Sequence, residues 1–353
     1  MDVIETDVAI IGGGLAGLAL ADRLHRAGKS FALFEARARF GGRIDAITTP
    51  HGRVDLGPSW FWPGQPLIAA LIADLGLSAF DQHADGDVVF QDAQGGVHRG
   101  LGYASMAGSL RIADGCLALI DGLVARLPAP ALHLDAPVVG VDADQGVILK
   151  DGRRCVARDI VLAAPPRVMA GLAFHPPLPD AAQTALAAIP TWMAGHAKFV
   201  AVYDDPFWRA AGLSGDVASR LGPLAEIHDA SGPTGAPAAL FGFLGLSASQ
   251  RAGRSAEIEA ASLAQLAQIF GPKARNPVAT RLQDWARQPL TATAQDQIPP
   301  NGHPHYGLSR DVAGLWQGRL HFAATETAPD MGGLMEGALT SAARVARLIL
   351  DRG

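Results

Sequence analysis

A glycine-rich segment near the N-terminus constrains the fold more than any other feature of this sequence. Three glycines spaced as GxGxxG follow a short apolar run that ends at residue 11: Gly12, Gly14 and Gly17. Helical apolar spacing follows over 15–27, and a second apolar run over 31–34 ends at Glu35. In a βαβ unit these glycines permit a tight turn, close approach to a pyrophosphate, and close packing of the helix. The pattern predicts a bound dinucleotide whose ribose hydroxyls donate to Glu35.

A second glycine pair extends the predicted site. Gly41 and Gly42 would let another backbone segment approach the cofactor, and Arg43 directly after them is expected to neutralise diphosphate charge. Nicotinamide enzymes do not need this extension, so the segment indicates FAD.

The C-terminal segment 322–338 carries a third glycine-rich motif before a predicted helix over 334–350. The N-terminus of such a helix would stabilise negative charge on the reduced flavin. Within the motif, Glu326 is expected to hydrogen-bond the ribityl chain.

Composition and charge exclude several function classes. The chain is 49% hydrophobic and 18% charged, with a net charge of −5 and no basic run, so nucleic acid is not an expected partner. Cys116 and Cys155 form neither a disulfide framework nor a metal-ligand pattern. His303 and His305 have no further ligand nearby, so we expect loop residues near a cleft and no metal. We expect a cytoplasmic protein with no signal peptide and no membrane segment, and a homodimer is left open.

Strand and helix patterns alternate at both ends of the chain, and a strand-rich section fills its middle. Helices are predicted over 65–77, 115–127 and 255–269, and strands over 140–164, 196–203 and 320–324. The predicted class is α/β, with an FAD-binding Rossmann-like, doubly wound domain and an inserted mixed α+β substrate domain.

The sequence resembles the flavin-containing monoamine oxidase family along nearly its whole length. Beyond the glycine motifs, the resemblance rests on DLGPSW at 55–60, AKFVAVYDDPFWR at 197–209, Trp285 with the proline loop after it, and TET followed by LMEGA near the C-terminus. It implies an FAD-binding domain from residues 1–72, 106–187 and 288–353 and a shortened substrate domain from 73–105 and 188–287. It also implies that Lys198, the predicted catalytic residue, holds a water against flavin N5.

The motifs and the resemblance together predict the residues of the site. Predicted cofactor contacts are Gly12, Gly14, Leu15, Ala16, Gly17, Glu35, Ala36, Gly41, Gly42, Arg43, Gly57, Pro58, Ser59, Trp60, Val138, Trp285, Thr325, Glu326, Gly333, Leu334, Met335 and Ala338. Predicted substrate-pocket residues are Trp60, Phe61, Phe243, Gln295 and Leu334, and Trp62 is a further candidate for the apolar wall.

Four departures from the family limit what the resemblance implies. Ala294 replaces the cysteine that membrane-bound members link to the flavin, so we expect non-covalent FAD. Gln295 and Leu334 replace two tyrosines that flank the substrate nitrogen. Ser59 and Trp60 stand where amino-acid oxidases have a carboxylate-binding arginine. A long helical segment expected between residues 99 and 109 is missing, which predicts a more open site.

The leading hypothesis is an FAD-dependent oxidase of a small-molecule amine. Hydride transfer to flavin N5, with O2 as acceptor, would give an imine or aldehyde and H2O2. One alternative is a flavin-dependent desaturase or dehydrogenase of an apolar non-amine substrate. Another is a weakly catalytic accessory subunit, suggested by the missing helical segment.

Overall fold

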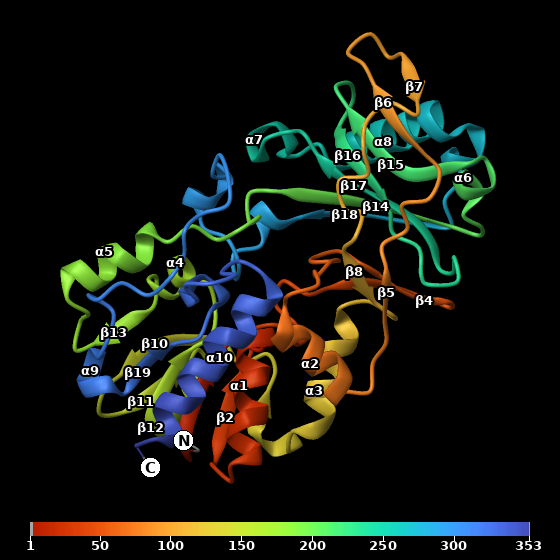
Figure 1. The fold of residues 1–353 in the computed structure, drawn as a ribbon. Helices are drawn as coiled ribbons and strands as arrows, with labels where there is room; N and C mark the ends of the chain where they lie inside the picture. The colour runs from red at the N-terminus through yellow and green to blue at the C-terminus, as the bar shows by residue number, and fades with distance from the viewer. Residues whose placement is uncertain (1–2, 353) are drawn as a thin grey trace.

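The computed structural model describes residues 3–352, and its chain forms two bodies, each built on one sheet (Figure 1). The larger body holds an eight-stranded sheet in the order β13-β10-β11-β12-β1-β2-β9, with β19 beside β12. Its strands are β1 (Val3–Ile11), β2 (Phe31–Phe34), β9 (Leu132–His133), β10 (Val138–Asp142), β11 (Gly146–Leu149), β12 (Arg154–Leu162), β13 (Ala173–His175) and β19 (Leu320–Phe322).

Helices cover both faces of this sheet. Successive side chains of β1 point to opposite faces and are apolar on both, so each face forms a core with the helices packed on it. Val8 and Ile10 face a core shared with α1 (Leu15–Arg26), α2 (Pro66–Asp74), α3 (Leu117–Arg126) and α10 (Met335–Leu350). Ala9 and Ile11 face a core shared with α4 (Pro166–Met169), α5 (Asp180–Ala188) and α9 (Leu315–Gly318). The predicted doubly wound α/β class is confirmed.

The smaller body holds a seven-stranded sheet in the order β18-β14-β17-β16-β15-β6-β7. Its strands are β6 (Asp87–Gln91), β7 (Val97–Arg99), β14 (Ala197–Tyr203), β15 (Leu213–Ser219), β16 (Leu224–Asp229), β17 (Ala238–Leu244) and β18 (Ala279–Asp284), and its helices are α6 (Phe207–Ala210), α7 (Ala248–Arg251) and α8 (Ser255–Phe270). One face of the sheet packs on α6 and α8. The opposite face, through Val200 and Phe241, packs on Val54 and Leu56 of the larger body. This contact places β14 beside the segment around residue 56.

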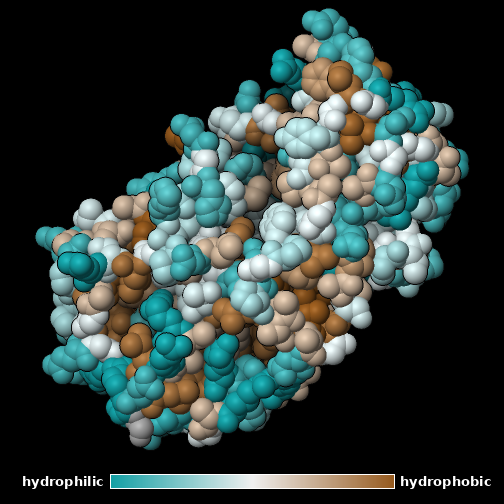
Figure 2. Space-filling model, in the orientation of Figure 1, coloured by the Kyte–Doolittle hydropathy of each residue, from teal (hydrophilic) through white to brown (hydrophobic). Residues whose placement is uncertain are grey.

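Short elements complete the structure. They are the strand pairs β3 (Ala46–Thr49) with β4 (Gly52–Asp55) and β5 (Ala79–Asp81) with β8 (Leu110–Ile112), and the 3-10 turns Ala129–Ala131, Pro272–Arg275, Trp285–Arg287, Ala294–Gln297 and Thr325–Thr327. The face shown in Figure 2 carries polar and apolar residues side by side and is hollowed between the two bodies.

The predicted elements agree with the structure apart from small differences at their ends. The helices predicted over 65–77 and 115–127 are the shorter α2 and α3, and the terminal strand ends at Phe322. Residues 100–109 link β7 to β8 without helix or strand, where the family's helical segment was expected. The division into two domains stays a prediction. Within residues 3–352, no helix is long and apolar enough to cross a membrane.

Candidate active site

A cavity of about 620 Å³ begins at the carboxyl ends of β1 and β2 and reaches the face of the second sheet. Ile11, Phe34 and Glu35 line one end of it, and Trp60, Lys198 and Phe243 line the other. In α/β sheets, ligands bind at the carboxyl ends of parallel strands. The volume lies within the range of pockets that bury a small molecule.

The glycine turn shapes the first end of the cavity. Gly12 has φ +114°, in the left-handed region, and a Cβ there would lie 2.8 Å from the carbonyl oxygen of Ala163. Gly14 is the N-cap of α1 and gives no side-chain cap. The first N–H groups of α1 are therefore available to an anion such as a diphosphate. Gly17 does not line the cavity; its Cβ would collide with the carbonyl of Gly12, so its role is close helix packing.

Glu35 lies in the cavity wall with its carboxylate held by backbone. One oxygen accepts from the N–H of Gly13 and the other from the N–H of Arg37, both at 2.9 Å. A carboxylate has about four acceptor sites, so capacity remains for ribose hydroxyls. The guanidinium of Arg37, which the sequence did not single out, also lines the cavity, 3.8 Å from Glu35.

Arg43 and Glu326 form an ion pair that the sequence did not predict. Two guanidinium nitrogens of Arg43 donate to the two oxygens of Glu326 at 2.5 and 3.1 Å. Glu326 is fully buried and is not among the residues that line the cavity, and its hydrogen bond to a ribityl chain stays a prediction. Arg43 lines the cavity, but its charge is already balanced by this carboxylate.

A second helix N-terminus meets the cavity. Leu334 is the N-cap of α10 and has no side-chain cap, and Gly333, Leu334 and Met335 all line the wall. Thr325 donates to the carbonyl oxygen of Leu334 at 2.7 Å, which fixes the turn before the helix. The positive end of the helix dipole therefore faces the cavity.

These features fit FAD. Two uncapped helix N-termini, a glycine turn and an acid after β2 line one continuous cavity, and Gly57 packs so closely on Arg43 that a side chain there would collide with its backbone. Diphosphate, ribose and isoalloxazine groups would each meet matching chemistry.

Lys198 lies on β14 in the opposite wall and is only 2% exposed. Its ammonium donates to the hydroxyl of Ser59 at 2.7 Å and to the carbonyl of Gly57 at 3.2 Å, and it lies 3.8 Å from the ring centroid of Phe241. An ammonium has three donors, so one remains for a ligand in the cavity. Burial lowers the pKa of Lys198 to about 7, against the opposing attraction of Asp55.

Aromatic and apolar side chains form the wall around Lys198. The indole N–H of Trp60 donates to the side-chain oxygen of Gln82 at 2.8 Å, which fixes the ring against Phe241 and Phe243. His303 lines the cavity and packs on Trp192 with ring centroids 4.7 Å apart, whereas His305 does not line it. Within residues 3–352, no cluster of three or more His, Cys, Asp or Glu could hold a metal ion.

Most predicted site residues line this one cavity. Those that do are Gly12, Gly14, Leu15, Ala16, Glu35, Ala36, Gly41, Gly42, Arg43, Gly57, Pro58, Ser59, Trp60, Trp62, Val138, Lys198, Phe243, Trp285, Thr325, Gly333, Leu334, Met335 and Ala338. The structure does not bring Gly17, Glu326, Phe61 or Gln295 to it. Phe61 is buried in the core of the larger body, and Gln295 is exposed on a 3-10 turn.

The sequence analysis missed other lining residues. They are Ile11, Phe34, Arg37, Ile44, Leu56, Gln65, Met106, Ala136, Pro137, Ala163, Ala164, Pro165, Val168, Met169, Leu172, Trp192, Met193, Ala194, His196, Ala197, Leu290, Thr291 and Ala324. A signal existed for part of this set, because residues 163–165 lie at the end of the strand region predicted over 140–164, directly after the observed end of β12 at Leu162. The carboxyl end of that strand meets the cavity alongside those of β1 and β2.

Comparisons with known proteins agree with this architecture. The model of the flavin containing amine oxidoreductase family matches residues 101–350, most of the chain. The chain belongs to this family. The NAD(P)-binding Rossmann-like domain model matches residues 10–75, the segment with the glycine turn. Family and cavity together assign FAD as the cofactor.

Curated relatives and solved structures are similar to this chain to different extents. A probable flavin-containing monoamine oxidase A of Dictyostelium discoideum is 30% identical over 60% of this chain and 46% of its own length. Amine oxidase B of Sus scrofa is 32% identical over 55% of this chain and 38% of its own length. These two matches cover less than half of either relative.

Two comparisons extend over nearly the whole chain. A putative monoamine oxidase of Mycobacterium tuberculosis is 26% identical over 96% of this chain and 95% of its own. That alignment runs over 447 positions, so the relative carries residues that this chain of 353 lacks. The structure of a putrescine oxidase bound to putrescine superimposes with a TM-score of 0.81 at 22% identity, over 99% of this chain and 100% of that one, which shows the shared fold.

Proposed function

We propose that this protein oxidises a small apolar amine with O2 to an imine and hydrogen peroxide, and that water then hydrolyses the imine to an aldehyde and ammonia or a smaller amine. The observation that carries the proposal is the buried Lys198 on the aromatic wall of the same cavity that holds the FAD-binding glycines. FAD supplies the redox chemistry when bound, accepting a hydride from the substrate carbon at N5 and passing two electrons to O2.

The residues of the wall favour the uncharged amine. An alkylammonium has a pKa near that of lysine, about 10.4. Apolar surroundings such as Trp60, Phe243 and Leu334 penalise its charged form by desolvation. The positive charge of the buried Lys198 also disfavours the ammonium form of the substrate, because like charges repel. The substrate nitrogen therefore keeps the lone pair that the oxidation needs.

The charges of the cavity narrow the substrate class. Among the lining residues that the structure describes, the carboxylate of Glu35 and the guanidiniums of Arg37 and Arg43 lie at the glycine end. Of the residues that line the cavity beside Trp60 and Phe243, none carries a carboxylate or a guanidinium. Glu226 pairs with Phe243 across β16 and β17, but it is held by His228 and lies outside the lining. An apolar monoamine is the substrate class that this end of the cavity fits.

A second candidate is a flavin-dependent dehydrogenase or desaturase of an apolar non-amine substrate. The observation in its favour is that Leu334 lines the wall while Gln295 is exposed outside the cavity. By the family resemblance, these are the two positions at which membrane-bound members carry tyrosines. No aromatic pair then encloses a substrate nitrogen.

Peroxide release separates the two candidates. Purified protein with FAD is assayed with benzylamine, putrescine and phenylalanine under air. We expect steady, stoichiometric peroxide and aldehyde from benzylamine, and much less from the diamine and the amino acid. Peroxide from none of the amines would contradict the proposal and favour the dehydrogenase. A preference for putrescine would contradict the substrate class alone.

A further inference from the structure

The link of residues 100–109, which joins β7 to β8, brings one side chain to the cavity. Of these residues, all described in the structure, only Met106 lines the wall. The backbone N–H and the hydroxyl of Ser109 both donate to the carbonyl oxygen of Met106, at 3.1 and 2.7 Å, and fix the turn that carries it. The link therefore contributes a wall residue without any helix or strand of its own.

Few contacts hold the link in place. Leu101 is 53% exposed and Tyr103 is 81% exposed, so apolar side chains of the link lie in water. Among the described residues, one hydrogen bond joins positions 101–108 to another part of the chain: the hydroxyl of Ser105 donates to Oε1 of Glu226 at 2.7 Å. A segment with so few contacts opens readily, so this bond decides where Met106 lies.

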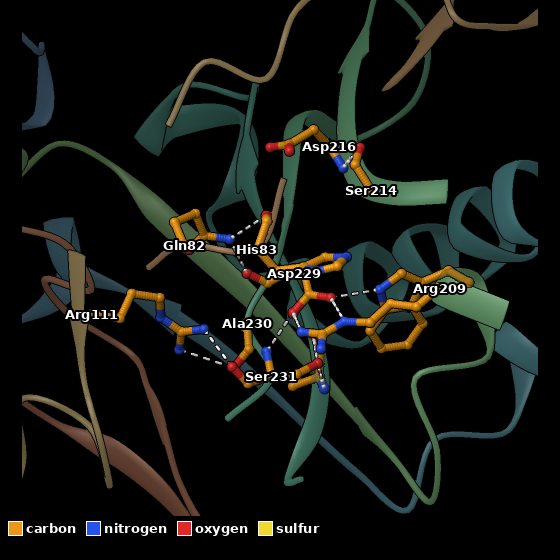
Figure 3. Close-up of polar contacts among 11 residues, drawn as sticks. Gln82, His83, Arg111, Arg209, Ser214, Asp216, Asp229, Ala230 and Ser231 are labelled. Carbon is orange, nitrogen blue, oxygen red and sulfur yellow. Dashed lines mark hydrogen bonds and ion pairs between the residues drawn. The ribbon is translucent and has the colours of Figure 1, made fainter. Parts of the chain in front are cut away.

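Glu226 on β16 is a well-fixed acceptor for Ser105. Nε2 of His228 lies 3.0 Å from the same oxygen of Glu226, and Nδ1 of His228 lies 2.7 Å from Oδ1 of Asp216. Asp216 is held in turn, because its backbone N–H donates to the hydroxyl of Ser214 at 3.1 Å (Figure 3). The neighbouring imidazole of His228 lowers the pKa of Glu226, so the acceptor keeps its charge.

The position of Glu226 in the sheet shows which part of the cavity the link meets. Glu226 and Lys198 each pair with Phe243 across antiparallel strands. Directly paired residues carry their side chains on the same face of the sheet. The three side chains therefore form a row, with Lys198 and Phe243 in the cavity wall and Glu226 outside it. Met106, next to Ser105, meets the cavity at the end of this row that is remote from Lys198.

We propose that Ser105 and Glu226 are positioning residues that limit the length of the amine that the cavity accepts, because their hydrogen bond holds Met106 in the wall beyond Phe243. With the bond intact, a substrate that extends past Phe243 meets the side chain of Met106. Without the bond, the link moves outward and a longer chain fits. The substrate class in this inference rests on the proposed function, but the hold of the bond on the link does not.

Proteolysis of the FAD-loaded protein measures the opening of the link without any turnover. Chymotrypsin cleaves after tyrosine, and cleavage after the exposed Tyr103 gives fragments 1–103 and 104–353, which mass spectrometry identifies. Ser105→Ala is expected to speed this cleavage about three- to ten-fold, the change in open population that one hydrogen bond accounts for. Ser105→Thr keeps the hydroxyl and should be cleaved at nearly the wild-type rate.

Two further variants show whether the effect belongs to this one bond. Ser309→Ala removes another exposed hydroxyl–carboxylate bond, to Asp311 at 2.9 Å outside the link, and should leave cleavage after Tyr103 unchanged. Glu226→Ala should speed cleavage as Ser105→Ala does. Because both changes break the same bond, the double variant is expected to be cleaved no faster than Glu226→Ala alone.

Binding of primary amines from butylamine to decylamine tests the limit on length. Absorbance of the flavin under nitrogen reports binding, whether or not a hydride is then transferred. Relative to butylamine, Ser105→Ala should bind the longer amines about five-fold more tightly than wild type does, a gain of about one or two buried methylene groups. Met106→Ala should show the same preference while its link is cleaved at nearly the wild-type rate.

Unchanged cleavage in Ser105→Ala, or additive effects in the double variant, would overturn the role of the bond. Faster cleavage with no change in length preference would overturn the limit on the substrate. If the protein oxidises none of these amines, the proposed function fails, but cleavage and binding still decide this inference.

Discussion

Lys198 shows how a single residue can gain a chemical role from where the chain places it. On a surface strand its ammonium would be solvated, but here it is enclosed by Ser59, Gly57 and the ring of Phe241. Desolvation disfavours the charged form, and the pKa of Lys198 falls to about 7. The lysine is therefore close to its point of charge change near neutral pH.

Lys198→Met is predicted to slow flavin reoxidation much more than flavin reduction. Electron transfer to O2 creates an anion that a fixed cation stabilises, and removing one such group costs roughly 10² or more in rate. The cation is present below the pKa, so wild-type reoxidation should slow as pH rises through about 7, and the variant should lose this dependence. Stopped-flow measurement of each half-reaction gives both rates. Equal slowing of the two halves would mean that Lys198 positions substrate or flavin instead.

Glu35→Ala is predicted to weaken FAD binding. The carboxylate retains acceptor capacity beyond its bonds to Gly13 and Arg37, and a hydrogen bond to a charged group contributes about 1–3 kcal/mol. The dissociation constant can be measured by flavin fluorescence quenching on titration into apoprotein. An unchanged constant would show that the ribose does not contact Glu35.

Residue positions were predictable where local rules decide them and not where distant segments meet. Glycine spacing located the turn, because φ and close packing are local requirements. The pair of Arg43 and Glu326 joins residues 283 apart in sequence, and no local pattern reveals it. Trp60 and Phe61 were predicted together, but successive residues of an extended chain point to opposite sides. Trp60 therefore lines the cavity while Phe61 lies in the core.

At the scale of elements, hydrogen bonds join the N-terminal ends of α10 and α2 near the cavity. Glu336, in the first turn of α10, accepts from the backbone N–H groups of Leu67 and Ile68 in the first turn of α2, at 2.9 and 2.8 Å. A carboxylate at a helix N-terminus accepts hydrogen bonds from backbone N–H groups that have no partner within the helix. Its negative charge also interacts favourably with the positive end of the helix dipole. The contact orients α2, which directly follows the cavity residue Gln65.

Glu336→Ala is predicted to destabilise the fold by about 2–4 kcal/mol, because two backbone N–H groups, one buried and one partly buried, lose their acceptor. Urea unfolding of the FAD-loaded protein, followed by circular dichroism, measures this change. Glu257→Ala is the matched control, since its ion pair with Arg254 is exposed to solvent and contributes little to stability. Equal stability of the two variants would show that α2 does not depend on this cap.

Elements with strong periodicity were predictable, and strands with polar residues at buried positions were not. The helix predicted over 255–269 is α8 with one residue added. Strands β15 and β16 were not predicted, since they carry polar residues such as Ser214, Asp216 and His228 at buried positions. These side chains can be buried because they form hydrogen bonds inside the protein. For example, Nδ1 of His228 lies 2.7 Å from Oδ1 of Asp216. Pairing of this kind overrides the alternation rule.

At the scale of the whole molecule, segments from the N-terminal part, the middle and the C-terminal part of the chain meet at one cavity. The glycine turn, β14 and the start of α10 lie far apart in sequence, and the contact of the second sheet with residues 54 and 56 sets their spacing. Short-range patterns predicted each wall separately. Their convergence follows from the two-body arrangement (Figure 1), which no single pattern encodes.

FAD is predicted to leave the protein completely on acid precipitation. Ala294 is exposed and offers no sulfur, and both cysteines of the chain, Cys116 and Cys155, are buried in the structure. The supernatant should hold one FAD per chain by absorbance. Yellow colour that stays in the washed pellet would show a covalent link.

Anaerobic bleaching of the flavin tests the central claim most directly. It observes electron transfer from the substrate to the flavin in the absence of O2 or any other external electron acceptor. FAD-loaded protein is mixed under nitrogen with primary, secondary and polyamines, and absorbance near the flavin maximum is followed. The account predicts full bleaching by apolar primary or secondary monoamines, with slow or no bleaching by polyamines. A flavin that stays oxidised with every amine, in protein that dithionite reduces fully, would contradict it.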